Sequence, residues 1–198
     1  KEAVTKELVE GALAGAQSVI AEQARRHRYL LRRLYPDEGP LARDRYPRHL
    51  AFFEAGATHR ERLLLAANRT GKTTAGAFEV ALHLTGDYAR YAPWWTGRRF
   101  ETPIRAWACG DTGTTVRDIV QAALLGSPDS PFSGLIPGHR ILGTTSRPGL
   151  PGAIESVRVR HATGGTSILQ FRSYDQRREA FQGTSQHVIW LDEECPED

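Results

Sequence analysis

The sequence contains no methionine and only two cysteines among its 198 residues, which leaves little material for thiol or thioether chemistry. Cys109 and Cys195 lie far apart without metal-ligand spacing, so free thiols in a reducing compartment are the better interpretation. Long apolar runs are absent too: the longest, 63–67 and 188–191, are only strand-sized and exclude a membrane-spanning helix. Residues 1–10 mix both charge signs and no apolar core follows them, so we expect no signal peptide there.

Lysine is scarce as well. Of the 26 basic residues only Lys1, Lys6 and Lys72 are lysines, and the rest are arginines. A coding bias toward arginine explains this preference, but it does not explain why one interior lysine is kept. A compact ammonium fits between two phosphates where the forked guanidinium is bulkier, so Lys72 is a candidate phosphate ligand. The formal net charge is only +3, which does not indicate a general polyanion binder.

What the chain does contain is the balance of a globular protein. Hydrophobic residues make up 40% and charged residues 25%, over a length that fits one domain with an extension. Residues 3–34 have the pattern of one long helix that ends before Pro36. Its basic stretch at 25–33 is typical of a solvated helix face, and contact with a phosphate backbone is the alternative. We predict a helical N-terminal extension and linker over 1–45 and a core domain over 46–198.

Within the core, apolar strand-like runs alternate with helical patterns, which is typical of βαβ units on a parallel sheet. The run at 188–191 is apolar on both faces and suits a central strand. The predicted elements are strands at 63–67, 104–109, 154–161, 167–173 and 188–191, helices at 72–85 and 114–125, an irregular excursion over 126–152, and a short helix or loop over 172–181.

Residues 66–73, Ala-Ala-Asn-Arg-Thr-Gly-Lys-Thr, match the phosphate-loop pattern G-x-x-x-x-G-K-[ST] except that Ala66 replaces the first glycine. The match follows a predicted strand and opens a predicted helix, so backbone N–H groups and the positive helix end converge on one point. Gly71 permits close approach of the backbone, Lys72 reaches the β- and γ-phosphates, and the Thr73 hydroxyl can ligate Mg²⁺. The predicted nucleotide-binding residues of this loop are Ala67, Asn68, Arg69, Thr70, Gly71, Lys72, Thr73 and Thr74. With the alternating elements, the loop predicts an α/β fold: a P-loop NTPase with a mainly parallel sheet flanked by helices.

Three carboxylates, Asp192, Glu193 and Glu194, directly follow the apolar run 188–191. Ligands of open parallel sheets bind beyond the carboxyl ends of the strands, so these acids are expected beside the phosphate loop. Asp192 suits coordination of Mg²⁺, and Glu193 is placed to polarise the water that attacks the γ-phosphate. A glutamate directly after the metal-binding aspartate is typical of hydrolytic motors and favours ATP hydrolysis coupled to movement. The alternative is a strand that runs into a solvated acidic turn, and the phosphate loop upstream weakens it.

The phosphate loop, the segment 181–184 (Phe-Gln-Gly-Thr) and the run 189–194 (Ile-Trp-Leu-Asp-Glu-Glu) together resemble the large terminase subunit of tailed phages. The resemblance covers about 46–194. That family couples ATP hydrolysis in its N-terminal domain to the threading of DNA into a procapsid, and a nuclease domain behind it trims the DNA. The resemblance implies Walker A roles for Gly71, Lys72 and Thr73, the Walker B acid for Asp192 and the catalytic glutamate for Glu193.

The resemblance singles out three further positions. Family members often carry an arginine inside the loop that senses or stabilises the γ-phosphate, and Arg69 resembles that residue; a plain surface charge is the alternative. Upstream, 46–53 resembles the adenine-side segment, where a glutamine commonly follows an aromatic residue and a proline. Here Tyr46 is the aromatic residue and His49 stands at the glutamine position. An imidazole cannot copy the paired donor and acceptor of an amide, so phosphate binding is better specified than adenine recognition.

The resemblance also implies partners and a place of action. The partners are double-stranded DNA, a portal protein, a small terminase subunit and other copies of the chain in a homo-oligomeric ring, all in the cytoplasm of the infected bacterial host and away from any membrane. The sequence stops four residues after Glu194, before the coupling segment, the remaining strands and the nuclease domain of the family. We therefore expect an ATPase core that is truncated after the Walker B strand.

Three other interpretations stay open from the residues alone. A helicase-like translocase of another lineage shares the strand, loop and Asp-Glu pattern, and procapsid-dependent activity would separate the two. A nucleotide-dependent binding module with little turnover has the same loop, and steady-state release of phosphate would identify it. A metal-dependent nuclease would use the acids at 192–194, but such a site needs no phosphate-cradling loop.

Overall fold

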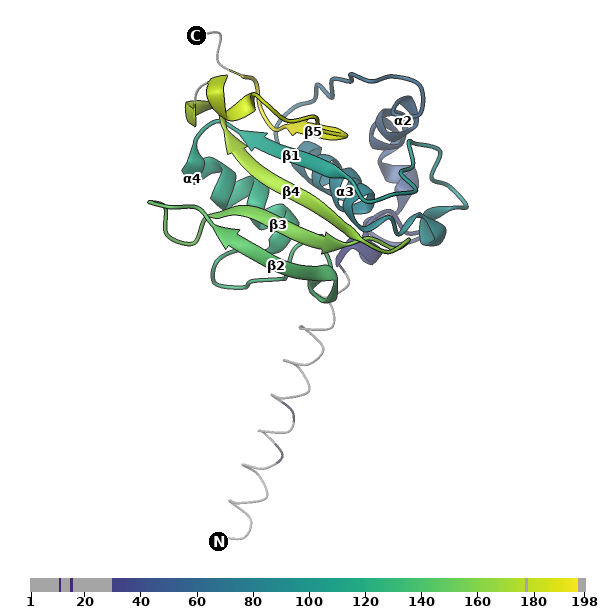
Figure 1. Ribbon diagram of the computed structural model, residues 1–198. Coiled ribbons are helices and arrows are strands. Elements are labelled where there is room, and N and C mark those ends of the chain that lie inside the picture. Colours follow the sequence, from purple (N-terminus) through teal and green to yellow (C-terminus); the bar gives the residue numbers. More distant parts are fainter. Residues whose placement is uncertain (1–10, 12–14, 16–29, 177, 196–198) are drawn as a thin grey trace, which may run out of the picture.

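The computed structural model describes residues 11, 15, 30–176 and 178–195, and their core is one twisted sheet with helices packed on it (Figure 1). The five strands lie in the order β2-β3-β4-β1-β5. β1 pairs in parallel with β4 and β5, whereas the β2-β3 and β3-β4 pairs are antiparallel. The strands are β1 (Arg105–Gly110), β2 (Ile141–Ser146), β3 (Ile154–Arg160), β4 (Thr166–Ser173) and β5 (Val188–Leu191).

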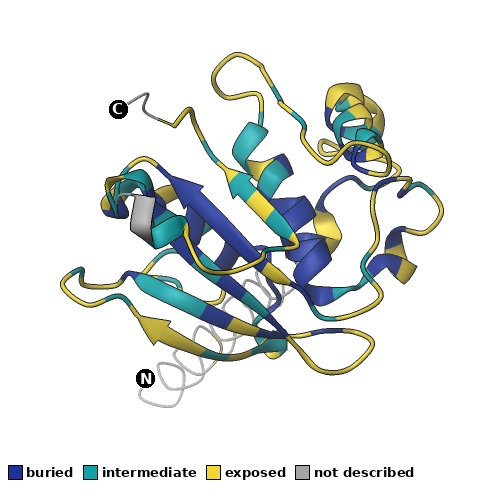
Figure 2. Ribbon diagram, turned by 45° about the horizontal axis from the view of Figure 1, so that its top comes forward, coloured by how far each residue is buried: buried dark blue, intermediate teal, exposed yellow. Residues whose placement is uncertain are grey.

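Helix α3 (Lys72–Thr85) is the main support of the sheet and has the limits that its sequence pattern predicts. It begins after Gly71 and ends at Gly86, whose left-handed backbone lets its N–H donate to the Leu82 carbonyl. Every residue from 77 to 85 is buried, because the helix contacts β1, β3, β4 and β5 and, on its flank, α5 (Ala122–Leu125) (Figure 2). The apolar positions that predicted its inner side are all buried: Phe78, Ala81, Leu82 and Leu84.

The helix predicted at 114–125 is also present, but it contains a π-helical stretch between two short α-helical pieces. Gln121, buried in that stretch, accepts a hydrogen bond from the Ile154 N–H at 2.8 Å and donates to the Gly152 carbonyl at 2.9 Å. These bonds attach the helix to the start of β3. The pieces are α4 (Gly113–Thr115), the π-helix η4 (Val116–Gln121) and α5.

The segment predicted to be an irregular excursion, 126–152, contains a strand that the sequence pattern did not reveal. β2 is an outer strand that pairs with β3 with two register shifts, and its side chains are mostly exposed. Its sequence, Ile-Leu-Gly-Thr-Thr-Ser, lacks a regular alternation of apolar and polar residues. The predicted hairpin β3-β4 is confirmed. These antiparallel neighbours make the sheet mixed, where a mainly parallel sheet was predicted, because short turns join β2, β3 and β4 without crossover helices.

On the other side of the sheet two predictions need correction. Residues 61–67 form no regular element, and Leu63 and Leu65 are 78% and 81% exposed, so the strand prediction for 63–67 is wrong. β5 does form, but at the edge of the sheet and not at its centre, with Ile189 and Leu191 about half exposed (Figure 2). Exposure alternates along β5, because Val188 and Trp190 pack against the core while Ile189 and Leu191 point to the opposite face of the sheet. No described segment pairs with the outer side of β5.

The segment around residue 46 packs on α3 through aromatic rings. Helix α2 (Pro47–Ala55) begins at a proline and turns His49 and Phe53 inward. The Tyr35 ring meets the rings of Phe53, Phe78 and Trp94 with centroid distances of 5.5, 4.9 and 5.9 Å. Of the helix predicted at 3–34, most lies outside the described residues, and its end is the 3₁₀ turn η1 (Leu30–Arg33). Within the described part of the chain, no helix has the length and apolarity to cross a bilayer.

Gly76 sets how closely α3 approaches β5. A Cβ atom built on Gly76 would lie 2.5 Å from Nε1 and 2.6 Å from Cε2 of the Trp190 indole, closer than atoms can pack. The glycine therefore fixes the contact between the helix that opens the phosphate loop and the strand that ends in the carboxylates.

We predict that Gly76→Ala lowers the free energy of unfolding by about 1–2 kcal/mol, because overpacking outweighs the roughly 1 kcal/mol that alanine gains in a helix. Chemical denaturation measures this change. The matched background is Trp190→Leu, which removes the indole and should make Gly76→Ala neutral or stabilising. An equal loss in both backgrounds would show that the indole contact is not the cause.

Candidate nucleotide site

The phosphate loop is a tight turn at the N-terminus of α3. Residues 68–71 form the turn, and Arg69 and Gly71 both have left-handed backbone, with φ of 64° and 87°. Gly71 precedes the first helical residue, and no side chain caps the helix there. The first N–H groups of a 14-residue helix are thus left to bind a ligand, and the helix dipole favours an anion at that point.

Lys72 folds back over this loop. Its Nζ donates to the carbonyl oxygens of Ala66 at 2.7 Å and Ala67 at 3.0 Å. Thr70 closes the same turn by donating from Oγ1 to the Ala67 carbonyl at 2.8 Å. The ammonium therefore lies against the loop, and the groups that accept its two hydrogen bonds are neutral carbonyls. Phosphate oxygens carry full negative charge and accept stronger hydrogen bonds from an ammonium than carbonyls do.

Thr73 and Asp192 come together although 119 positions separate them. The Thr73 hydroxyl lies 3.1 and 3.2 Å from the two carboxylate oxygens of Asp192. Asp192 continues the β5 ladder, since its N–H donates to the Cys109 carbonyl at 3.0 Å. The sequence prediction that the strand ends beside the loop is therefore confirmed in the geometry of these two residues.

The surroundings of Asp192 disfavour a bare negative charge. Burial raises the pKa of Asp192 above its ordinary value, and the neighbouring Glu193 raises it further, while the Thr73 hydrogen bond and Lys72 lower it. Hydroxyl and carboxylate oxygens are ligands that Mg²⁺ accepts, and Mg²⁺ usually binds one or two protein oxygens together with waters and phosphates. Thr73 and Asp192 thus fit the metal predicted for them, and a cation there would favour the ionised carboxylate.

The two glutamates after Asp192 are both exposed, and their backbones differ. Glu193 has a left-handed backbone, with φ of 71°, which is costly for a residue with a side chain. The hydroxyl of Tyr174 donates to its carbonyl oxygen at 3.3 Å. Tyr174 follows the end of β4, so the turn that carries Glu193 is held from a second strand. Sequence reasoning missed Tyr174, because nothing in its own pattern links it to the acids.

A small cavity lies beside the loop on the side of α2. Its volume is about 120 Å³. Both residues predicted for the adenine side, Tyr46 and His49, line it together with Gly71 and Thr74. The other lining residues were not predicted: Leu34, Tyr35 and Leu41. They lie in the segment interpreted as extension and linker, where apolar residues near Pro36 were the only available signal. The remaining predicted loop residues, Asn68, Arg69 and Thr70, are exposed around the turn.

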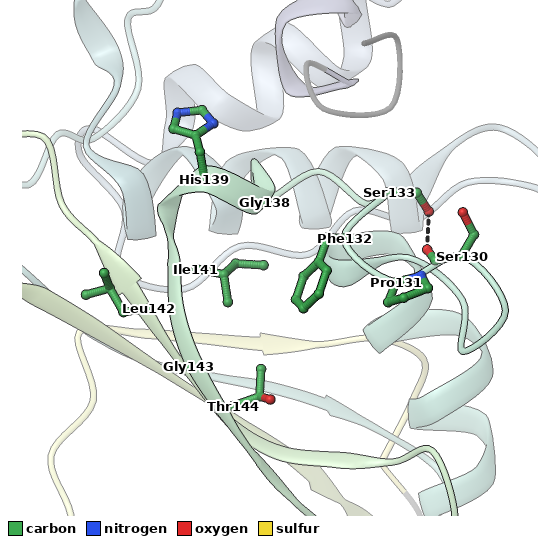
Figure 3. A pocket seen from close by; sticks show the side chains of 10 residues that line it. All are labelled: Ser130, Pro131, Phe132, Ser133, Gly138, His139, Ile141, Leu142, Gly143 and Thr144. Carbon is green, nitrogen blue, oxygen red and sulfur yellow. Dashed lines mark hydrogen bonds between the residues drawn. The ribbon is translucent and has the colours of Figure 1, made fainter. Parts of the chain in front are cut away.

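A larger hollow in the described structure is not part of this site. It is open, has a volume of about 740 Å³, and lies against the other edge of the sheet, between residues 130–133, 138–139 and 141–144 (Figure 3). Phe132 and Ile141 point toward each other across it, and no carboxylate or lysine lines it (Figure 3). None of the predicted site residues lines it.

Comparison with known proteins decides the family. A family model described as the terminase large subunit, T4likevirus-type, N-terminal, matches residues 63–198. The chain belongs to the large terminase subunit family. It is similar to the terminase large subunit of Salmonella phage P22, with 36% identity over 168 residues that cover 76% of this chain and 34% of that protein. No solved structure gives a significant match to the chain.

The residues matched by the family model include most of the candidate site. The matched range, 63–198, includes the phosphate loop and all three acids, but it excludes Tyr46 and His49. The chain spans about a third of the length of its P22 relative. The family resemblance inferred from the phosphate loop and from segments 181–184 and 189–194 is confirmed.

We predict that Lys72→Ala in this terminase chain abolishes the rise in melting temperature that Mg²⁺ and ATP produce, while the fold persists. The ammonium donates to two carbonyl groups of the loop and to no buried partner that the structure describes, so its loss costs binding more than folding. Thermal unfolding with and without nucleotide measures the effect. Arg48→Ala, which removes another exposed cation near the site, is the matched control and should keep the shift. Unchanged ATP affinity of Lys72→Ala by calorimetry would contradict the assignment of the loop.

Proposed function

We propose that this chain is the ATP-hydrolysing motor domain that powers the packaging of viral DNA into a procapsid. The observation that carries the proposal is the pairing of Thr73 with Asp192 directly beside Lys72. A hydroxyl, a half-buried carboxylate and an ammonium at the N-terminus of a helix are the groups that phosphoryl transfer from a Mg²⁺-bound triphosphate requires.

Each residue has a distinct part in the proposed reaction. The N–H groups of the loop and Lys72 hold the β- and γ-phosphates, and Thr73 and Asp192 hold Mg²⁺, which neutralises charge on the phosphates when it is bound. Glu193 orients and polarises the attacking water, since its turn places a carboxylate one residue beyond the metal-binding acid. Arg69 stands exposed on the loop with its backbone already left-handed, and it stabilises the charge that develops on the γ-phosphate.

The wider role follows from the family. Membership of the large terminase subunit family implies a role in viral DNA packaging. We therefore propose double-stranded DNA, a portal protein and a small terminase subunit as partners. We further propose that the motor works as a homo-oligomeric ring in the cytoplasm of the infected host. The nuclease activity of the family is not assigned to this chain, because the described acids 192–194 lie at the phosphate loop.

Substitutions of Asp192 and of Glu193 should affect ATP binding and turnover differently, and this difference tests the proposal. Asp192→Ala removes a metal ligand and should weaken Mg²⁺-dependent ATP binding as well as turnover. Glu193→Gln keeps the size of the side chain but removes the charge that polarises water. It should bind ATP about as well as the parent and lose on the order of a hundredfold or more in turnover. Single-turnover hydrolysis beside equilibrium binding measures both.

Glu194→Gln is the matched control, since it makes the same change one residue further along the exposed turn. It should keep much of the activity. Loss of hydrolysis in Glu194→Gln but not in Glu193→Gln would place the water-activating acid one position later. Full activity in both would leave only a solvated acidic turn, and a chain that binds ATP without turnover would be a binding module.

A further inference from the structure

His49 lies between the aromatic residues around α2 and the phosphate loop. The ring is 6% exposed, and its Nδ1 lies 2.9 Å from the hydroxyl of Tyr35. Burial lowers the pKa of the ring, and a hydrogen bond with the backbone of Thr70 in the phosphate loop opposes that shift. Tyr46 stacks on the ring with a centroid distance of 5.3 Å and an interplanar angle of 20°.

The ring also packs directly on the loop. A Cβ atom built on Gly71 would lie only 3.2 Å from Cε1 of His49, so the imidazole covers the face of the loop where a side chain is missing. Gly71 has left-handed backbone, and Thr70 precedes it. His49 therefore contacts the two residues that set the direction of the chain before α3.

One neutral tautomer satisfies both hydrogen bonds. With the proton on Nε2, the ring donates to the Thr70 carbonyl, and Nδ1 accepts from the Tyr35 hydroxyl. Burial lowers the pKa of His49, which favours this neutral form at pH 7. Tyr35 is itself buried in the aromatic cluster on α3, so the two bonds connect the core to the loop. No nitrogen of the ring is left to bind a nucleotide base.

We propose that His49 is a positioning residue that holds the phosphate loop in its binding conformation, and that the neighbouring cavity accepts adenine and guanine nucleotides alike. The proposal rests on the proposed function, because it concerns the same nucleotide. It assigns His49 to the loop and not to the base, although His49 stands where the family commonly has a base-reading glutamine.

The rest of the cavity supports the tolerance for either purine. Leu34 and Leu41 contribute apolar contact, which does not distinguish one purine from another. Besides His49, the polar side chains among the residues that line it are Tyr35, Tyr46 and Thr74, and each of them carries a hydroxyl. A hydroxyl either donates or accepts, so it can pair with the amino group of adenine or the carbonyl oxygen of guanine. Strong discrimination needs a group that is left unpaired by the wrong base, and these hydroxyls are not such groups.

A ligand that has phosphates but no base can show whether His49 positions the phosphate loop or reads the base. We would measure binding of inorganic tripolyphosphate, ATP and GTP, each with Mg²⁺, to the full chain and to His49→Phe. The expected result is a loss of roughly three- to tenfold for all three ligands, the scale of one hydrogen bond. The parent chain should bind ATP and GTP within about tenfold of each other.

Two further variants complete the test. Tyr35→Phe removes only the hydroxyl that orients the ring, keeps the aromatic packing, and should weaken tripolyphosphate and ATP by the same factor; it serves if His49→Phe unfolds. Tyr46→Ala is the opposite control: it should weaken ATP and GTP and leave tripolyphosphate unchanged.

Several results would overturn the proposal. If His49→Phe and Tyr35→Phe weaken ATP but not tripolyphosphate, the imidazole reads the base. If the parent prefers ATP over GTP by about a hundredfold or more, the cavity is selective. If the parent binds none of the three ligands, the proposed function itself fails and this inference fails with it, which is distinct from the first two outcomes.

Discussion

The hydrogen bond between Thr73 and Asp192 is the contact on which the site depends. It joins the first turn of α3 to the end of β5 and so places the phosphate loop beside the acids. Two packing features keep it in place. Gly76 lets the helix approach the Trp190 indole, and β5 pairs with the buried strand β1 from Ala106 to Cys109. A shift of either element by a small fraction of a turn would separate the hydroxyl from the carboxylate.

Backbone conformation and packing from α2 together define the turn of the phosphate loop. Arg69 and Gly71 already have the backbone conformation that turns the chain, and His49 packs on the turn from α2. Left-handed backbone at Arg69 and Glu193 costs on the order of 1–3 kcal/mol at each position. Four described non-glycine residues have this conformation, Tyr35, Arg69, Phe132 and Glu193, and two of them, Arg69 and Glu193, lie in the segments proposed to act on the γ-phosphate and on water.

The sequence predicted the site better than the sheet around it. The limits of α3 could be read from the helical pattern and from Gly86, and the loop and acids follow motifs whose local chemistry is self-contained. That residues 63–67 form no strand, and that β5 lies at the edge of the sheet, could not be predicted from the sequence. An apolar run does not show whether a partner strand pairs with it. β2 was missed because an outer strand of polar residues carries little pattern. Tyr35 and Tyr174 reach the site only through tertiary packing, which no local spacing reveals.

The outer side of β5 has a consequence for any measurement of assembly. Its unpaired backbone groups and the exposed Ile189 and Leu191 offer a template for another strand. Two copies that met along this edge would run antiparallel about a two-fold axis and form a closed dimer. A ring needs a different geometry, in which one surface of each copy meets a different surface of the next. A dimer of this chain would therefore point to edge pairing and not to a motor ring, and a charged substitution at Ile189 should abolish that dimer.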